Sequence, residues 1–402
     1  MTDFETIKQI LQEVTLAISN RVNDSTDLWD AYFDCNKEGL FKELDMAILD
    51  CKELKIFEDA SLCVGDIIIF FNFERLREWL VIHSMKTDTN KSISAIQRLL
   101  LGEPFFATAV LALARVSLPK TIQLGNNVTL CEFSSNEFLN QSKDENIEHH
   151  EIDVHHISAA ITVEFEHPVH LGPRGHYRPS IYMGMVDEFF YALQKAYRAL
   201  LILGIVRPQP PALVGHAIFV PLDFPGAYSK NLHHSVKIDS YWPRLEFNDD
   251  ECSLAKSLFE SFENLSPNLR DSLFIPMSRL RSAMTEFKDF ADAAIDLGIA
   301  LESILIKSDE STEITYRISM RGARLLGKTL DERLDLKKKL TKIYGMRSKA
   351  AHRGIVQSKS IDKEVLLLRE GFNLTAKAIQ IVLTNKLYTD KDLDSLLLQS
   401  ES

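Results

Sequence analysis

The sequence predicts an α+β protein in which a mixed α/β region is followed by an all-helical bundle. Two patterns support this: apolar residues recur every three or four positions near both ends, and short extended runs separated by Gly, Asn and Pro fill the middle. The length of 402 residues exceeds the size at which one core usually stops growing. We therefore expect a mainly helical region at 1–115, a mixed α+β region at 116–250 and a helical bundle at 251–402.

Helices are expected to dominate the first region. Apolar spacing predicts one helix in FETIKQILQEVTLAI, residues 4–18, and another in SAIQRLLLGEPFFATAVLALA, residues 94–114. The run VGDIIIFFNF, residues 64–73, fits a buried strand, because it is short, apolar and rich in Ile and Phe.

The middle region alternates between strand and helix signals. TIQLGNNVTLCEF, residues 121–133, predicts a hairpin that turns at Gly-Asn-Asn, and ISAAITVEFEHP, residues 157–168, predicts a strand that ends at its proline. MVDEFFYALQKAYRALLILG, residues 185–204, has helical spacing. The prolines of RPQPPALVGHAIFVPLDFPG, residues 207–226, favour a turn.

The last region is helical throughout. Acidic residues that suit a helix N-terminus open the helix expected at 249–265, and the proline of NLSPNL separates it from the next element. The stretch Arg279 to Ile306 contains no proline and predicts one long bundle helix. Further helices are expected at 314–327, 331–354 and 363–387, and their short connections indicate a bundle.

The ends and the cysteines exclude several protein classes. The acidic start MTDFETIKQI lacks the layout of a secretory signal, and the apolar stretches are too short to span a bilayer. We therefore expect a cytoplasmic protein without a membrane partner. The five cysteines form no C-x-x-C pair, so they indicate neither a disulfide framework nor a zinc knuckle.

A literal P-loop string, GARLLGKT at 322–329, is present but lies in the wrong context. A phosphate cradle of this type follows a strand and opens a helix. The preceding ITYRISMR has helical spacing instead, and Leu325 and Leu326 belong on an apolar helix face. We expect Gly327 to end a helix.

Histidines gather in the middle region, where seven of the twelve lie between His149 and His176. Strand alternation would place His149 and Glu151 together on one face and His150 and His156 together on the opposite face, so a metal site is one interpretation. Adjacent histidines point to opposite faces, however, and H-E-x-x-H is missing from the sequence. A solvated strand edge is the favoured interpretation, and we expect no metal and no other cofactor.

The net charge of −11 conceals a strong asymmetry along the chain. From Met277 to the end, 22 Lys and Arg face 18 Asp and Glu, a net of +4, so residues 1–276 carry −15. Between Arg317 and Lys359 there are 13 basic and 3 acidic residues, a net of +10 in 43 positions. Such a local field attracts phosphates.

The motif YGMRSKAAHRG, residues 344–354, lies inside this basic segment. Arg347 and His352 are five positions apart, a rotation of about 140° on a helix, so their side chains diverge. Spacing alone favours a solvated helix end capped by Gly354. Two copies related by a two-fold axis would instead bring two arginines and two histidines to one cleft, since Ala350 and Ala351 permit a close helix approach.

Three blocks of the C-terminal region share order and spacing with a known family. FADAAIDLGIALESILI, SDESTEITYRISMRGARLLG and YGMRSKAAHRG together resemble the HEPN superfamily, in particular its Apea-like branch. The resemblance covers residues 277–385, under a third of the chain. The R-x4-6-H pattern of the family matches Arg347 and His352, and its adjacent polar position matches Ser348. The remaining matches are an acidic pair, Asp296 and Glu302, and an E-x-x-Y-R stretch, Glu313, Tyr316 and Arg317.

The resemblance implies a metal-independent endoribonuclease that works as a homodimer through its HEPN domain on single-stranded or tRNA-like RNA. Arg347 would hold the scissile phosphate, and His352 would exchange a proton with the 2′-oxygen or the leaving 5′-oxygen. Ser348 would orient the imidazole or contact the phosphate. Asp296 and Glu302 would support this pair, or serve as salt-bridge partners inside the bundle. The residues expected to attract the RNA backbone are Lys337, Lys338, Lys339, Lys349 and Arg353.

Three functional hypotheses remain open at this stage. In the first, the chain is a toxin or anti-phage effector whose region 1–250 senses a phage or cellular trigger or restrains the nuclease. In the second, a non-catalytic HEPN dimer binds a nucleotide or RNA as a sensor or scaffold. In the third, the basic segment binds an acidic partner, including the acidic part of its own chain.

Overall fold

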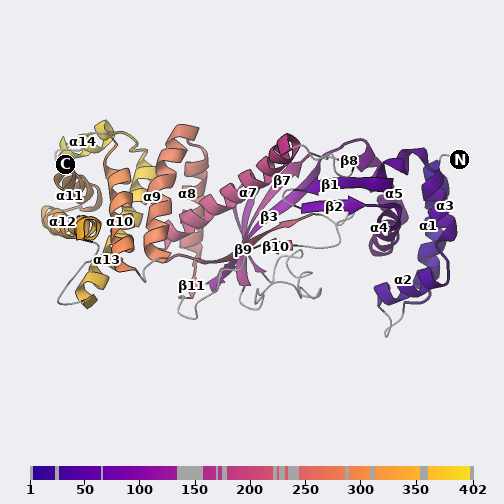
Figure 1. Ribbon diagram of the computed structural model, residues 1–402. Helices are drawn as coiled ribbons and strands as arrows, with labels where there is room; N and C mark the ends of the chain where they lie inside the picture. Colours follow the sequence, from indigo (N-terminus) through magenta and orange to yellow (C-terminus); the bar gives the residue numbers. More distant parts are fainter. Residues whose placement is uncertain are drawn as a thin grey trace. The chain divides into compact units, whose positions relative to one another are not determined.

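The computed structural model describes most of the chain in two compact units, each built from segments that are separated in the sequence. The first unit comprises 1–110, 163–194 and 216–234, and the second comprises 111–162, 195–215 and 235–402. The described residues are 3–22, 27–64, 67–133, 157–168, 171–173, 179–220, 224–225, 231–233, 244–285, 289–307, 313–353 and 361–398. The three consecutive regions expected from the sequence stay a prediction, whereas the α+β class is confirmed (Figure 1).

The first unit begins with helices, as expected. They are α1 (Asp3–Ser19), α2 (Leu28–Lys37), α3 (Lys42–Asp50), the 3-10 helix η1 (Lys52–Asp59), α4 (Phe73–Lys86) and α5 (Thr89–Leu100). The carboxylates of Asp27 and Asp88 and the amide of Asn72 cap α2, α5 and α4 by accepting a backbone N–H. The predicted strand is β2 (Ile67–Phe71). It pairs antiparallel with β1 (Ala60–Val64), which pairs on its other side with β8 (Leu171–Pro173).

The prediction of a helix through residue 114 is wrong after α5. Residues 105–114 form β3 (Phe105–Ala114), whose backbone is extended and whose side chains are buried at eight of ten positions. A strand buried on both faces has a continuous apolar run rather than an alternating one, so its pattern resembles that of a buried helix. Gly102, which has φ 70°, makes the turn between the two elements.

A six-stranded sheet has the order β10-β9-β3-β7-β6-β5. The predicted hairpin is β5 (Ile122–Gly125) and β6 (Val128–Glu132), which pair antiparallel, and the predicted strand is β7 (Ile157–His167). Within the segment predicted as a proline-rich turn, β9 (Ala212–Phe219) is a strand paired with β10 (Asn231–His233), so that prediction was too coarse. A short parallel pair joins β4 (Val116–Ser117) to β11 (Leu245–Glu246).

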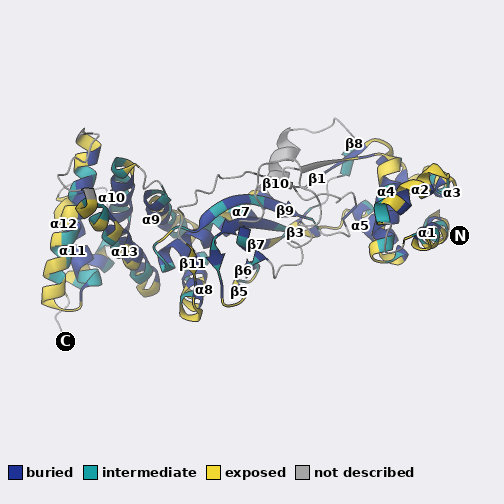
Figure 2. Cartoon of the chain, turned by 90° about the horizontal axis from the view of Figure 1, so that it is seen from below, coloured by how far each residue is buried: buried dark blue, intermediate teal, exposed yellow. Residues whose placement is uncertain are grey.

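The predicted middle helix is α7 (Pro179–Val206). Its segment Glu188–Val206 is long and apolar enough to cross a membrane, but most of that segment is buried inside the protein. Such burial is characteristic of a core helix in a water-soluble fold. Figure 2 shows the same buried character along β3, β7 and α7.

The C-terminal part of the second unit is the predicted helical bundle (Figure 1). Its helices are α8 (Asp249–Glu263), α9 (Pro267–Thr285), α10 (Phe290–Leu305), α11 (Ile314–Leu326), α12 (Leu330–Arg353), α13 (Ile361–Asn385) and α14 (Asp390–Leu398). The single long helix predicted for Arg279–Ile306 is wrong, because α9 and α10 divide this stretch. The Asp289 carboxylate accepts the N–H groups of Ala291 and Asp292 and so starts α10.

Glycines set the close packing of α10 to α13. A Cβ built on Gly298 of α10 would lie 2.2 Å from Arg347 Cγ of α12. One on Gly322 of α11 would lie 2.5 Å from a Leu340 methyl, and one on Gly371 of α13 would lie 2.6 Å from a Leu297 methyl. These helices therefore approach one another more closely than any larger residue would allow.

Candidate functional site

The helix that carries both Arg347 and His352, α12, starts at Leu330, directly after the P-loop-like string, and the last residue of the string caps it. Thr329 Oγ1 accepts the Glu332 N–H, while the Glu332 carboxylate accepts the N–H groups of Lys328 and Thr329, which is a capping box. As predicted, Gly327 ends the preceding helix α11. The string thus forms a helix end and a helix start, and its lysine and threonine belong to a cap rather than to a phosphate cradle.

The side chain of Arg347 extends from α12 onto α10. Its aliphatic stem packs on Gly298, its Nη2 lies 3.4 Å from Glu302 Oε1, and its guanidinium carbon lies 5.7 Å from the centre of the Tyr344 ring. Tyr344, one turn earlier on α12, donates its hydroxyl hydrogen to the same Glu302 oxygen. Arginine, tyrosine and glutamate therefore form one half-buried cluster.

The electrostatics of this cluster favour a neutral tyrosine beside an ion pair. Burial, followed by the hydrogen bond to Glu302 and its negative charge, raises the pKa of Tyr344 to about 12, although Arg347 acts in the opposite direction. The Nε–H of Arg347 is buried and has no acceptor among the described residues. Part of the donor capacity of this guanidinium is thus unused within the described chain.

Asp296, the other member of the predicted acidic pair, lies elsewhere. It is buried on α10 and accepts a hydrogen bond of 2.8 Å from Arg279 Nη1 of α9. Glu302 is therefore the acidic residue that contacts Arg347, and Asp296 joins α9 to α10 as an ion-pair partner inside the bundle.

His352 is exposed near the C-terminal end of α12, and Lys349 is exposed one turn before it. Ser348 is half-buried, and the Arg353 side chain lies outside the described residues. Helix geometry separates Arg347 and His352 by about 140° around the axis, and the half-buried position of one and the exposure of the other agree with this. One chain therefore does not direct these two side chains into a common site.

The three consecutive lysines of α12 have different surroundings. Lys337 Nζ lies 5.4 Å from the centre of the Tyr316 ring, and Lys338 is exposed. Lys339 Nζ lies 2.8 Å from Asp335 and 2.7 Å from Glu370, and these hydrogen bonds raise its pKa to about 12. The charge of Lys339 is shared between two carboxylates, whereas Lys338 faces solvent.

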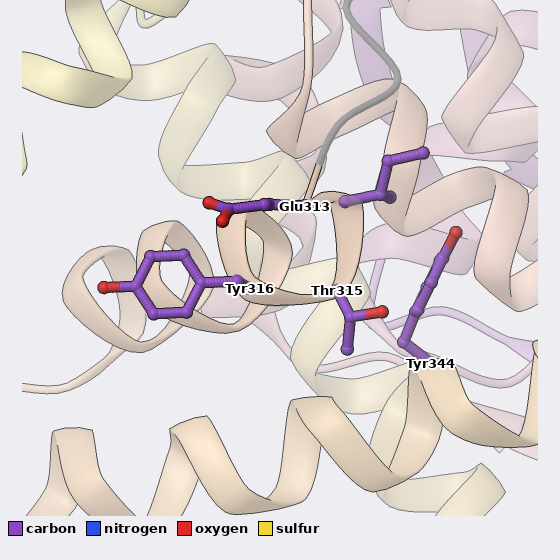
Figure 3. Close-up of a pocket in the computed structure, with 5 residues that line it drawn as sticks. Glu313, Thr315, Tyr316 and Tyr344 are labelled. Carbon is purple, nitrogen blue, oxygen red and sulfur yellow. The ribbon is translucent and has the colours of Figure 1, made fainter.

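A pocket of about 600 Å³ lies around the first turn of α11 and is lined by Glu313, Ile314, Thr315, Tyr316 and Tyr344. Figure 3 shows Glu313 and Tyr316 pointing to one side of this turn and Thr315 pointing to the other side, toward Tyr344. Glu313 has φ 54°, in the left-handed region, and its carboxylate does not cap the helix. Tyr344 belongs both to this pocket and to the Arg347 cluster.

Of the seven histidines between His149 and His176, six lie outside the described residues. The described one, His167, is buried at the end of β7, where its Nδ1 lies 2.7 Å from the Pro168 carbonyl oxygen. Its ring stacks on Phe105 at 5.3 Å. This histidine is part of the core of the first unit.

Sequence reasoning gave no role to Tyr344 or Gly298, although both determine the surroundings of Arg347. Tyr344 precedes Arg347 by three positions on one helix, so adjacent side chains were foreseeable. The contact of Gly298 with Arg347 depends on how α10 and α12 pack, and no local pattern encodes it.

No family model matches the chain, and neither the curated proteins nor the solved structures that were compared contain a match. Function is therefore inferred from the residues and their geometry.

Proposed function

We propose that the chain is a metal-independent endoribonuclease of HEPN type that acts as a cytoplasmic homodimer and serves as an anti-phage or toxin effector. One observation carries the proposal: the guanidinium of Arg347 is held at the α10–α12 contact with a donor that has no acceptor among the described residues, on the helix that exposes His352. Both residues lie in the segment of net charge +10. The effector role follows from the family resemblance alone.

The reaction needs only groups that the chain and RNA supply. The ribose 2′-oxygen attacks the adjacent phosphorus, the bond to the 5′-oxygen of the next nucleotide breaks, and a 2′,3′-cyclic phosphate and a 5′-hydroxyl result. An imidazole exchanges protons near neutral pH, so His352 takes the 2′-hydroxyl proton or gives one to the leaving oxygen. Arg347 binds the phosphate oxygens and stabilises the negative charge that grows on them.

A dimer can bring Arg347 and His352 to a common site although the two side chains diverge within one chain. In a two-fold assembly, Arg347 of one subunit and the histidine at position 352 of the other face the same cleft. Glu302 then holds Arg347 in one orientation before RNA binds, which lowers the entropy lost in the transition state.

The test is cleavage of a labelled single-stranded RNA and of tRNA by the full chain in the presence of a chelator. Arg347→Ala should lower the rate by about 10²–10³-fold, as for the loss of one donor to a developing anion. His352→Ala should lower it by about 10²–10⁴-fold. Lys363→Ala, which removes an exposed cation of α13 outside the basic segment, is the matched control and should cleave normally.

Three measurements separate the proposal from its alternatives. Mass spectrometry should find 2′,3′-cyclic phosphate ends, and light scattering should find a dimer for every variant. RNA binding without cleavage would favour the non-catalytic sensor or scaffold. Cleavage that survives both the Arg347→Ala and the His352→Ala change removes these residues from catalysis.

A further inference from the structure

The pocket around the first turn of α11 has two ends with different chemistry. At one end lie the Glu313 carboxylate and the Tyr316 ring, and at the other lie the Thr315 hydroxyl and Tyr344 (Figure 3). The pocket is open to solvent, and its volume of about 600 Å³ is large enough for one nucleotide. We propose that this pocket binds one nucleotide of the RNA and selects a base that carries an exocyclic amino group.

Tyr316 supplies the surface for stacking. Tyr316 is 54% exposed, so its ring is accessible to a base. Lys337 Nζ lies over its ring at 5.4 Å. A ring face that attracts an ammonium group also stacks on a base, and the lysine, on its flexible stem, then pairs with a flanking phosphate.

Glu313 supplies the selectivity. Its carboxylate points to the same side of α11 as the Tyr316 ring, so a base stacked on that ring brings its edge to the carboxylate (Figure 3). An ionised carboxylate only accepts hydrogen bonds. It therefore favours the amino groups of cytosine, adenine and guanine over uracil, whose edge presents carbonyl oxygens at the corresponding position.

The other end of the pocket connects the bound nucleotide to the proposed site of cleavage. From a base on Tyr316, the sugar and phosphate extend past Thr315 toward Tyr344, whose ring contacts the Arg347 guanidinium. The pocket thus holds a base next to the phosphate that Arg347 binds. This inference rests on the proposed function insofar as the bound nucleotide belongs to the RNA substrate.

The experiment measures the binding of fluorescein-labelled 2′-O-methyl hexacytidylate and hexauridylate to the full chain by fluorescence anisotropy. Methylation removes the attacking hydroxyl, so binding is measured without cleavage. The wild type should bind the cytidine oligomer about tenfold more tightly, a discrimination typical of one base-edge contact. Glu313→Gln should abolish this preference, because an amide both donates and accepts.

Tyr316→Ala should weaken binding of both oligomers about tenfold through loss of stacking, and Tyr316→Phe should restore it. Tyr191→Ala is the matched control: it removes a tyrosine of α7 that is 67% exposed, and should leave binding unchanged. Equal affinity of the wild type for the two oligomers, or unaltered binding by Tyr316→Ala, overturns the proposal. Circular dichroism of each variant confirms that it is folded.

Cleavage of unmodified RNA distinguishes a failure of the pocket from a failure of the nuclease. Cytidine preference that depends on Glu313, in a chain that cleaves no RNA, supports the pocket and refutes the ribonuclease. Cleavage that depends on Arg347 but does not respond to changes at Glu313 and Tyr316 supports the ribonuclease and refutes the pocket.

Discussion

Replacing Gly298 by alanine should force α10 and α12 apart at the position of Arg347. The new Cβ would lie 2.2 Å from Arg347 Cγ and 2.6 Å from Arg347 Cβ, whereas ordinary contacts are 3.4–4 Å. Arg347 Cβ is fixed by the α12 backbone, so a change of rotamer cannot relieve that second contact, and a helix must move. Overpacking of this kind costs about 1–3 kcal/mol of stability.

Gly345→Ala isolates this packing cost. Gly345 lies in α12, two residues before Arg347, and a Cβ built on it meets nothing within 4 Å. Each substitution gains about 1 kcal/mol of helix propensity, so this gain cancels when the two variants are compared. Gly298→Ala should therefore be less stable than Gly345→Ala by about 1–3 kcal/mol.

Two assays test this prediction on the full chain. Chemical denaturation followed by circular dichroism gives the difference in the free energy of unfolding, and RNA cleavage gives the functional effect. A displacement of about 1 Å at a catalytic group can lower the rate about 10²-fold, so Gly298→Ala should lose far more activity than Gly345→Ala. Equal stability and equal activity of the two variants would refute the packing argument.

Three further predictions concern the charged clusters of the bundle. Glu302→Gln should lower the pKa of Tyr344 from about 12, since it removes the charge that disfavours the tyrosinate, and 13C NMR of labelled tyrosine, assigned with Tyr344→Phe, measures the shift. Arg321→Met should destabilise the chain by about 3–5 kcal/mol, because the buried arginine pairs with Asp390 and Asp394 of α14 and donates to the Leu305 carbonyl oxygen. Hydrogen exchange in which α14 of the variant is as protected as in the wild type would contradict this. Burial lowers the pKa of Lys307 from 10.5 to about 8, so between pH 8 and pH 10.5 the unfolded chain binds more protons than the folded chain. The free energy of unfolding should therefore rise by about 1–2 kcal/mol from pH 7 to pH 9.5. Lys307→Met should lack this rise, and parallel pH profiles of the variant and the wild type would refute the assignment.

The sequence predicted correctly the turns and element ends that a few adjacent residues determine. The hairpin at Gly125, the strand that ends before Pro168 and the end of α11 at Gly327 all depend on a few adjacent residues. The strand β3 was taken for part of a helix, because an apolar run of this length fits a buried strand and a buried helix equally well. Which one forms depends on the neighbouring strands of the sheet. The strand β9 was included in a predicted turn, because prolines flank it on both sides.

The break between α9 and α10 shows a second limit. Neither proline nor glycine marks it, and the signal is the Asp289 carboxylate accepting two N–H groups at the start of α10. A capping aspartate within a continuous amphipathic pattern is easily taken for an exposed helix residue. The candidate site was limited in the same way. Glu302 was expected to support Arg347 from the family resemblance, but Tyr344 was given no role although it lies one turn before Arg347 on α12. Only packing between helices brings Gly298 to Arg347.

The contact between Gly298 and Arg347 links two positions that are almost fifty residues apart in the chain. A methyl group at the first position cannot coexist with the present placement of the second, so neither can drift independently during evolution. In diverged descendants of this sequence, the glycine should therefore be inherited together with the arginine and should be free to change only where the arginine has been lost.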